Sequence, residues 1–213
     1  MNRCVIVGSA EINDYETVKE YLKDDDYMVF CDGGLKHVSG IGKEPNLIVG
    51  DFDSHEKPET DIETIVLPCE KDDTDTCHAL NECIARGYRD FMFLGCIGER
   101  MDHTLGNLYL LVSLKKKGLD GFILDDYSEI SIVGDKGVAI EDKYSFFSIL
   151  ALSDVVDGIY IEDAKYPLEN ASIKSGFQYG ISNEVIKGKT AHVRVENGNL
   201  LLVKVIYKQF IKK

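Results

Sequence analysis

The first 124 residues alternate between short apolar runs and amphipathic segments. This alternation is typical of a parallel sheet covered by helices. The runs that predict strands are residues 3–7, 27–31, 47–49, 63–67, 90–94 and 121–124. The segments that predict helices are residues 15–22, 74–86 and 104–117. The pattern therefore predicts an α/β domain with a mostly parallel sheet.

The pattern changes after Asp125-Asp126, where short strand-like runs follow one another with Gly or Asp turns between most of them. Such spacing predicts an antiparallel sandwich. The runs are residues 129–133, 136–140, 144–150, 155–161, 190–196 and 200–207. Glu196-Asn197-Gly198-Asn199 predicts a hairpin, because Asn-Gly accepts the positive φ angles of a tight turn. We expect two domains, residues 1–126 and 127–213.

The chain carries a formal net charge of -13 over 213 residues. Nucleic acids and anionic membranes attract basic surfaces, so neither is an expected partner. A polyphosphate can bind only where metal ions and a few Lys or Arg residues reverse the local field. A cationic substrate is favoured.

The six cysteines form no Cys-x-x-Cys pair, which argues against a zinc ribbon and a redox dithiol. The N-terminal residues lack the apolar core of a signal peptide, and no apolar stretch approaches a membrane span. We expect a cytoplasmic protein whose thiols are free and buried.

Four polar clusters each come directly after a predicted strand of the first domain. The carboxyl ends of parallel strands meet at one edge of the sheet, where open α/β folds bind their ligands. We therefore expect these clusters to lie together. They are Asp32-Gly33-Gly34, Gly50-Asp51-Phe52-Asp53-Ser54, Lys71-Asp72-Asp73-Thr74-Asp75 and Gly98-Glu99-Arg100-Met101-Asp102-His103.

The acidic residues of these clusters are candidate metal ligands. Asp51 and Asp53 flank one residue and can present two oxygens to a Mg²⁺ ion that also binds substrate phosphates. A solvated turn is the alternative for this loop. Asp72 and Asp75 are three residues apart at a predicted helix start, so they are expected on one helical face. Helix capping is the alternative for this pair.

Lys71 and Arg100 are the cations expected to neutralise phosphate oxygens, although either could pair with a neighbouring Asp instead. Asp32-Gly33-Gly34 allows the backbone to approach a ligand closely. His103 could bind a phosphate or cap the helix that follows it. The sequence contains no P-loop, dinucleotide fingerprint or Gly-x-Ser-x-Gly elbow, which disfavours P-loop kinases, Rossmann dehydrogenases and serine hydrolases.

Five motifs, in order along the whole chain, resemble the thiamine pyrophosphokinase family. Tyr166-Pro167-Leu168 is similar to the bacterial branch of this family. The motifs are Asp32-Gly33-Gly34, Gly50-Asp51-Phe52-Asp53-Ser54, Lys71-Asp72-Asp73-Thr74-Asp75, Gly98-x-Arg100-x-Asp102-His103 and Gly180-Ile181-Ser182-Asn183-Glu184.

The resemblance implies transfer of the β,γ-diphosphoryl unit of ATP to the hydroxyl of thiamine, which gives thiamine diphosphate and AMP. It implies a three-layer α/β/α catalytic domain that binds ATP and Mg²⁺, followed by a small β-sandwich domain that binds thiamine. It also implies a homodimer with active sites at the subunit interface.

The same resemblance implies a role for each motif residue. The implied Mg²⁺ ligands are Asp51, Asp53, Asp72 and Asp75. The implied ATP-binding residues are Asp32, Gly33, Lys71, Arg100, Asp102 and His103, with Asn107 as a further candidate. The implied catalytic residues are Asp53, Asp75, Lys71 and Arg100. Either Asp53 or Asp75 could accept the proton of the thiamine hydroxyl, unless the metal alone lowers that barrier. Ser182 and Asn183 are implied to hydrogen-bond the aminopyrimidine of thiamine.

The chain departs from the family in one respect, because it contains no Trp, whereas many members stack a Trp on thiamine. Phe177 and Tyr179 are the aromatic residues closest in sequence to Ser182 that could substitute. Two other functions stay open. Asp-x-Asp loops also hold metals in other nucleotide-processing transferases and phosphohydrolases. A thiamine-binding module without activity, with solvated acidic loops, is the second alternative.

Overall fold

The computed structural model describes residues 3–53, 57–70, 72–98, 100–134 and 136–206. Ser54, Lys71 and Glu99 of the predicted clusters lie outside the described residues. The chain divides into two compact units, Met1–Asp126 and Tyr127–Lys213. Within the described ranges, no helix has both the length and the apolar composition that crossing a membrane requires.

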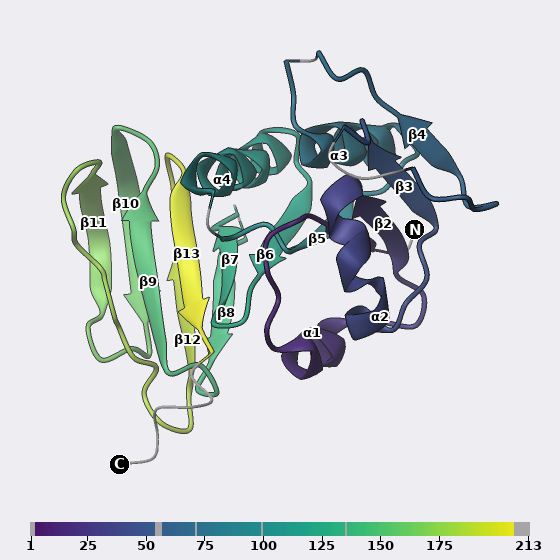
Figure 1. The fold of residues 1–213 in the computed structure, drawn as a ribbon. Coiled ribbons are helices and arrows are strands. Elements are labelled where there is room, and N and C mark those ends of the chain that lie inside the picture. Colours follow the sequence, from purple (N-terminus) through teal and green to yellow (C-terminus); the bar gives the residue numbers. More distant parts are fainter. Residues whose placement is uncertain (1–2, 54–56, 71, 99, 135, 207–213) are drawn as a thin grey trace. The chain divides into compact units, whose positions relative to one another are not determined.

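The first unit is built on a parallel sheet (Figure 1). Its strands are β1 (Cys4–Val7), β2 (Tyr27–Cys31), β3 (Leu47–Gly50), β4 (Thr64–Val66), β5 (Asp90–Leu94) and β6 (Asp120–Leu124). Strand pairing gives the order β4-β3-β2-β1-β5-β6, with every pair parallel. The chain adds strands on one side of β1 as far as β4 and then returns to add β5 and β6 on the other side. The topological switch point of the sheet therefore lies between β1 and β5.

Helices cover this sheet on both faces. Their bounds are α1 (Tyr15–Tyr21), the 3₁₀ helix η1 (Asp32–His37), α2 (Val38–Ile41), α3 (Asp75–Ala85) and α4 (Met101–Lys116). Right-handed crossovers place α1 and α2 on one face and, after the reversal, α3 and α4 on the other. Contacts between α1 and α2, and between α3 and α4, agree with this arrangement. The predicted α/β fold class is confirmed.

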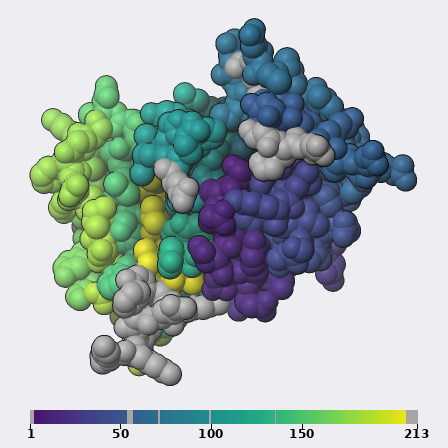
Figure 2. Space-filling model, viewed as in Figure 1, coloured from purple at the N-terminus to yellow at the C-terminus, as the bar shows by residue number. Residues whose placement is uncertain are grey.

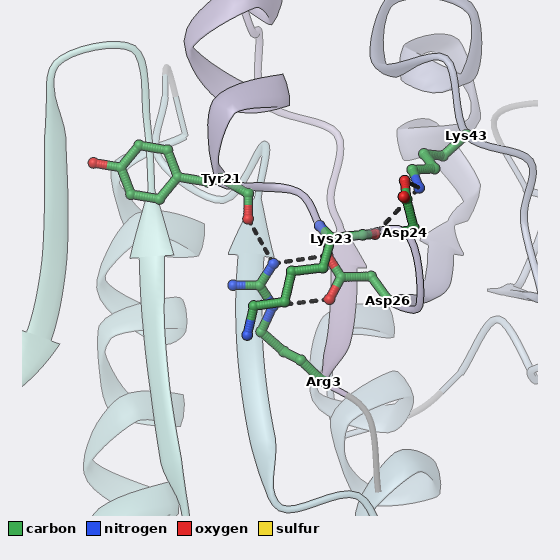
Figure 3. A network of polar contacts seen from close by, with 6 residues as sticks. All are labelled: Arg3, Tyr21, Lys23, Asp24, Asp26 and Lys43. Atoms are coloured by element: carbon green, nitrogen blue, oxygen red, sulfur yellow. Dashed lines mark hydrogen bonds and ion pairs between the residues drawn. The ribbon is translucent and has the colours of Figure 1, made fainter.

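A buried ion pair joins the amino ends of β1 and β2 (Figure 3). The Arg3 guanidinium donates to both carboxylate oxygens of Asp26, at 3.0 and 2.7 Å. It also donates to the Tyr21 carbonyl at 2.7 Å, and the Lys23 amide donates to Asp26 at 2.8 Å. The carboxylate of Asp26 has no exposed side-chain surface. This network fixes the α1–β2 connection to the start of the central strand.

The second unit contains two antiparallel sheets. Its strands are β7 (Ser128–Ile132), β8 (Val138–Glu141), β9 (Phe146–Ala151), β10 (Val155–Glu162), β11 (Leu168–Lys174), β12 (Thr190–Arg194) and β13 (Leu200–Val205). One sheet has the order β7-β13-β9 and the other has the order β11-β10-β12-β8. Apolar residues from both sheets form one core, which includes Phe147, Ile149, Ile159, Val193 and Leu202. The predicted antiparallel sandwich is confirmed.

The predicted hairpin at Glu196-Asn197-Gly198-Asn199 is wrong. Strand β12 pairs with β8 and β10, whereas β13 pairs with β7 and β9, so the two strands lie in different sheets. Gly198 does adopt a positive φ of 91°. The Asn197 carbonyl accepts from the Asp157 amide at 3.1 Å. The Asn-Gly turn therefore carries the chain from one sheet to the other.

Three elements were not predicted by the sequence pattern: helix α2, strand β11 and the 3₁₀ helix η1. Strand β11 is mostly exposed, and its residue Ile173 is the one that is buried, so it lacks a clear apolar alternation. Asp32-Gly33-Gly34 is the first half of the 3₁₀ helix η1 and not a flexible turn. Glycine is required there because a Cβ on Gly34 would lie 2.3 Å from the Val7 carbonyl oxygen.

Candidate functional site

A pocket of about 440 Å³ lies at the carboxyl edge of the parallel sheet, beside the switch point. Its walls come from the segments that follow β1, β2, β3 and β5 and from the start of α3. The lining residues that carry charge or can titrate are Cys31, Asp32, Asp51, Asp53, Cys69, Asp73, Asp75, Arg100 and His103. Parts of all four predicted clusters therefore meet in one place, as the shared position after strands predicted.

Three carboxylates form the centre of this pocket. One oxygen from each of Asp32, Asp51 and Asp53 lies within 4.8 Å of the other two. Asp32 is buried at the start of η1, whereas Asp53 is exposed. Gly50 permits this approach, because a Cβ at that position would lie 2.6 Å from the Cβ of Asp32. The sequence made Asp51 and Asp53 candidate metal ligands, whereas the family resemblance placed Asp32 among the ATP-binding residues.

The backbone of the Asp51-Phe52-Asp53 loop is strained. Phe52 has a φ of 54°, in the left-handed region that bulky residues avoid. Such a conformation costs about 1 to 3 kcal/mol and persists where the surroundings demand it, often at a functional site. The Asp53 amide donates to the Asp51 carboxylate at 3.4 Å, which closes the loop on itself.

The three carboxylates fit a hard divalent cation. Oxygen ligands about 2.1 Å from a Mg²⁺ ion lie about 3 to 4.2 Å from one another, so small side-chain rotations would complete the geometry. Carboxylate oxygens are the donors that Mg²⁺ prefers in proteins. Asp32, Asp51 and Asp53 are thus the residues that would hold the ion.

The third cluster contributes differently from the prediction. Helix α3 begins at Asp75, and its N-cap Thr74 accepts from the Cys77 amide at 3.3 Å. Asp72 precedes the helix, so Asp72 and Asp75 do not share a helical face, and that expectation is wrong. Asp73 and Asp75 line the pocket. Lys71 lies outside the described residues.

The fourth cluster brings a cation to the pocket. Arg100 lines it and precedes α4, and its guanidinium forms a two-point ion pair with Asp102, at 3.0 and 2.7 Å. These hydrogen bonds hold the pKa of Asp102 well below its usual range and raise the pKa of Arg100. Asp102 thus orients the guanidinium instead of lining the pocket itself. His103, exposed in the first turn of α4, also lines the pocket.

The sequence reading missed the loop after β1. Gly8 and Ser9 line this pocket and also an adjoining one of about 280 Å³, which Lys36, Glu11 and Asn107 help to line. Asn107 donates to the Cys96 carbonyl at 2.8 Å, so its amide holds the loop after β5. The sequence did contain a signal for this loop, because Gly8-Ser9 directly follows the first buried strand. The other clusters were predicted from the same position after a strand.

The two residues predicted to bind thiamine lie in the second unit and differ in environment. Asn183 is buried, and its side chain accepts from the amides of Tyr166 and Glu184 and donates to the Tyr166 carbonyl. The side-chain amide of Asn183 therefore holds the Tyr166 segment in place. Ser182 is exposed with a φ of 59°, and its amide donates to the Ser148 hydroxyl at 3.0 Å.

Near Ser182, two aromatic side chains are exposed. Phe177 and Tyr179 stack on each other with ring centroids 6.2 Å apart and an interplanar angle of 19°. Together with Ile181 and Lys174 they line a pocket of about 220 Å³. The cation of Lys174 disfavours a positively charged ligand at this position.

The fold and the pocket define a class: a two-unit α/β protein whose parallel-sheet unit has a pocket lined by carboxylates at the carboxyl edge of its sheet. Two family models match the chain, "Thiamin pyrophosphokinase, catalytic domain" over residues 18–123 and "Thiamin pyrophosphokinase, vitamin B1 binding domain" over residues 136–200. The chain therefore belongs to the thiamin pyrophosphokinase family.

Individual relatives agree with this assignment. The chain is 27% identical over 192 residues to the thiamine pyrophosphokinase of Bacillus subtilis, covering 86% of this chain and 90% of that one. The crystal structure of thiamin pyrophosphokinase from Geobacillus thermodenitrificans matches with a TM-score of 0.83 and 26% identity, over 97% of this chain and 99% of that one. The Candida albicans enzyme, at 15% identity and a TM-score of 0.72 over 96% and 89% of the two chains, shares the fold.

Proposed function

We propose that this chain is a thiamine diphosphokinase, which transfers the β,γ-diphosphoryl group of ATP to the hydroxyl of thiamine and releases AMP. Membership of the family supports the reaction. The observation that carries the assignment of the site is the approach of the Asp32, Asp51 and Asp53 carboxylates within 4.8 Å, at the sheet edge where α/β folds bind ligands. Arg100 lines the same pocket and supplies the opposite charge that an anionic triphosphate needs.

In this proposal Asp32, Asp51 and Asp53 hold Mg²⁺, and Asp75 lies beside them in the same pocket. The bound ion supplies charge neutralisation at the phosphate oxygens. Asp72, which was also expected to bind the metal, does not line the pocket among the described residues. We keep Lys71 as a phosphate ligand on the family resemblance alone.

The residues of this chain contribute mainly by positioning and charge, since phosphoryl-type transfer involves little covalent chemistry of the protein. The Arg100 guanidinium, oriented by Asp102, presents its remaining N–H groups to phosphate oxygens. His103 lies next to it at the start of α4, where an imidazole N–H can donate to the same anion. Gly33 keeps the backbone of η1 close to the ligand.

The hydroxyl of thiamine must lose a proton during transfer. Asp53 and Asp75 both line the pocket and are the candidate acceptors. The acidic pocket also favours the cationic thiazolium ring of thiamine. Ser182 is the residue of the second unit whose exposed hydroxyl can hydrogen-bond the aminopyrimidine, whereas Asn183 acts by holding the segment in place.

We further propose that the protein is a cytoplasmic homodimer, as the family resemblance implies. A surface compatible with a second copy is present on α4, where Met101, Leu105 and Tyr109 recur every four residues and are 63%, 49% and 68% exposed. An exposed apolar stripe of this kind often marks an interface.

The test is incubation of the purified chain with Mg²⁺, ATP and thiamine, followed by separation of nucleotides and thiamine esters. We expect thiamine diphosphate and AMP in equal amounts. ADP with thiamine monophosphate would contradict diphosphoryl transfer. Nucleotide consumption without thiamine would indicate a phosphohydrolase, and unchanged ATP would indicate a binding module.

A further inference from the structure

A buried histidine shares a helix with Asp32, one of the residues that line the pocket of about 440 Å³, which we call the carboxylate pocket. His37 is 1% exposed and is the last residue of η1, the same short helix whose first residue is Asp32. It does not line either pocket at the sheet edge. A fully buried imidazole requires partners for both ring nitrogens, because an unpartnered buried polar atom costs about 1 to 3 kcal/mol.

Both nitrogens of His37 have a partner. Nε2 lies 2.9 Å from the Ala10 carbonyl oxygen, and Nδ1 lies 2.8 Å from the Tyr15 hydroxyl. A carbonyl only accepts, so Nε2 carries the proton and donates to Ala10, and Nδ1 accepts from the Tyr15 hydroxyl. This arrangement describes a neutral ring in a single tautomer. Burial lowers the pKa of His37 and so favours the neutral form, with Lys36 acting in the same direction and Glu11 opposing it.

These two hydrogen bonds join η1 to the loop between β1 and α1, through Ala10, and to the first residue of α1, Tyr15. That loop, residues 8–14, contributes Gly8 and Ser9 to the carboxylate pocket. It is tightly held, since a Cβ on Gly33 would lie 2.7 Å from Ser9 and one on Gly98 would lie 2.8 Å from Ala10. The position of the loop therefore sets how closely the segments after β2 and β5 can approach.

The Tyr15 side chain is equally constrained. A Cβ on Gly40, in α2, would lie 2.4 Å from the Tyr15 ring, so glycine makes room for this ring. The ring is tilted by 55° to the imidazole, with centroids 6.0 Å apart. Packing on Gly40 thus directs the hydroxyl at His37, which links α1, α2 and η1 in one network.

We propose that His37, with Tyr15 as its hydrogen-bond donor, is a positioning residue that holds Asp32 and the β1–α1 loop in the geometry needed to bind the divalent cation. The inference rests on the proposed function only in taking the carboxylate cluster as a cation site. Replacing a residue that orients a metal ligand without binding the metal itself typically weakens metal affinity by about 10- to 100-fold. Asp32 is held here through the short helix that it shares with His37.

The test measures Mn²⁺ binding by the nucleotide-free chain with isothermal titration calorimetry, for three variants. His37→Leu removes both hydrogen bonds, and we expect the Mn²⁺ Kd to rise about 10-fold or more. His37→Gln keeps a donor that can reach the Ala10 carbonyl, and Tyr15→Phe keeps the packed ring, so both should weaken binding by a smaller factor. Unfolding in urea is measured in parallel.

Asp26→Asn is the matched control, because it weakens a buried network at the opposite edge of the same sheet. We expect it to lower stability and leave the Mn²⁺ Kd unchanged. If His37→Leu also leaves the Kd unchanged, or if Asp26→Asn raises it as much, His37 has a structural role only. If Asp51→Asn and Asp53→Asn bind Mn²⁺ as the wild type does, the assignment of the cation site is wrong. That result is distinct from a failure of the role proposed for His37.

A second readout tests the tautomer. In ¹⁵N-labelled protein at neutral pH, we expect a His37 ring with a protonated Nε2 and an unprotonated, hydrogen-bond-accepting Nδ1. The Tyr15→Phe variant should shift the Nδ1 resonance and leave the Nε2 proton in place. A ring protonated at Nδ1, or an imidazolium, would contradict the network.

Discussion

Charged side chains are arranged in opposite ways at the two ends of the parallel sheet. At the amino edge, Arg3 and Asp26 are buried together, and each carboxylate oxygen of Asp26 accepts a hydrogen bond from the guanidinium (Figure 3). At the carboxyl edge, three carboxylates with like charge lie within 4.8 Å of one another. The first arrangement joins opposite charges within the protein, whereas the second gathers negative charge around a pocket.

We interpret this difference as one between a structural network and the proposed ligand site. Like charges brought together disfavour the folded state, because their mutual repulsion is relieved when the chain unfolds. Proteins retain such arrangements where a bound ligand compensates for them, often at some loss of stability. Figure 2 shows the same side of the molecule as Figure 1, with the described residues of the first unit coloured from purple to teal. A close pair of opposite charges at the amino edge, and a cluster of three carboxylates at the carboxyl edge, distinguish the two edges.

Removal of one site carboxylate should have the largest effect on function and almost none on the fold. We expect Asp51→Asn and Asp53→Asn each to lower turnover by about 10³-fold, which corresponds to about 4 kcal/mol of transition-state stabilisation. The free energy of unfolding in urea should stay within about 1 kcal/mol of wild type or rise, because a like charge is removed. Initial rates with Mg²⁺, ATP and thiamine, together with urea titrations, measure both.

Wild-type rates in these variants would show that the carboxyl edge is only a solvated surface. A loss of more than about 2 kcal/mol in unfolding free energy would show that these carboxylates stabilise the fold, as Asp26 does. Asp61→Asn, an exposed aspartate that does not line the pocket, is the control for removal of one negative charge.

Periodicity predicted the fold of this chain well, because every strand of the parallel sheet is either a short apolar run or ends in one. All four residues of β1 are buried, as a central strand covered on both faces requires. Strand β11 escaped prediction because it is largely exposed, and the Asn197-Gly198 turn was misread because local turn geometry does not determine which sheet the next strand joins.

The site was predicted in its location more than in its details. Four residues that span residues 51–100 were predicted to lie close together because each comes after a strand, and all of them line one pocket. They are Asp51, Asp53, Asp75 and Arg100. The closeness of Asp32 to Asp51 depends on strand order, which the sequence does not state. The hydrogen bonds that occupy Asn183, and those of His37, depend on distant segments and leave no local pattern.

Disruption of the amino-edge pair should reverse the outcome, with a moderate loss of stability and no change in catalysis. In Asp26→Asn, Arg3 stays charged and buried without its counter-ion, and we expect the unfolding free energy to fall by about 3 kcal/mol. Turnover and both KM values at 25 °C should match wild type while the protein remains folded. The double variant Arg3→Met with Asp26→Leu should recover most of the stability, since two apolar side chains leave no buried charge. A change in KM for ATP would break the separation between the two edges.

The smallest effect is expected from an ion pair at the carboxyl edge. Arg100 and Asp102 have side chains that are 70% and 65% exposed, so solvent screens their attraction and Asp102→Asn should leave the unfolding free energy close to that of wild type. It should raise the KM for ATP about threefold, because the guanidinium loses the partner that orients it.

The pH dependence of this effect follows from the pKa of Asp102, which Arg100 holds below its ordinary value. The ion pair is therefore fully formed at any pH above the ordinary pKa of an aspartate, and it is lost only as the pH falls through the lowered pKa of Asp102. The KM ratio of variant to wild type should therefore be constant between about pH 6 and pH 8. A ratio that varied over this range, or an effect on stability as large as that of Asp26→Asn, would mean that the Arg100–Asp102 pair does not act by orienting a ligand-binding cation.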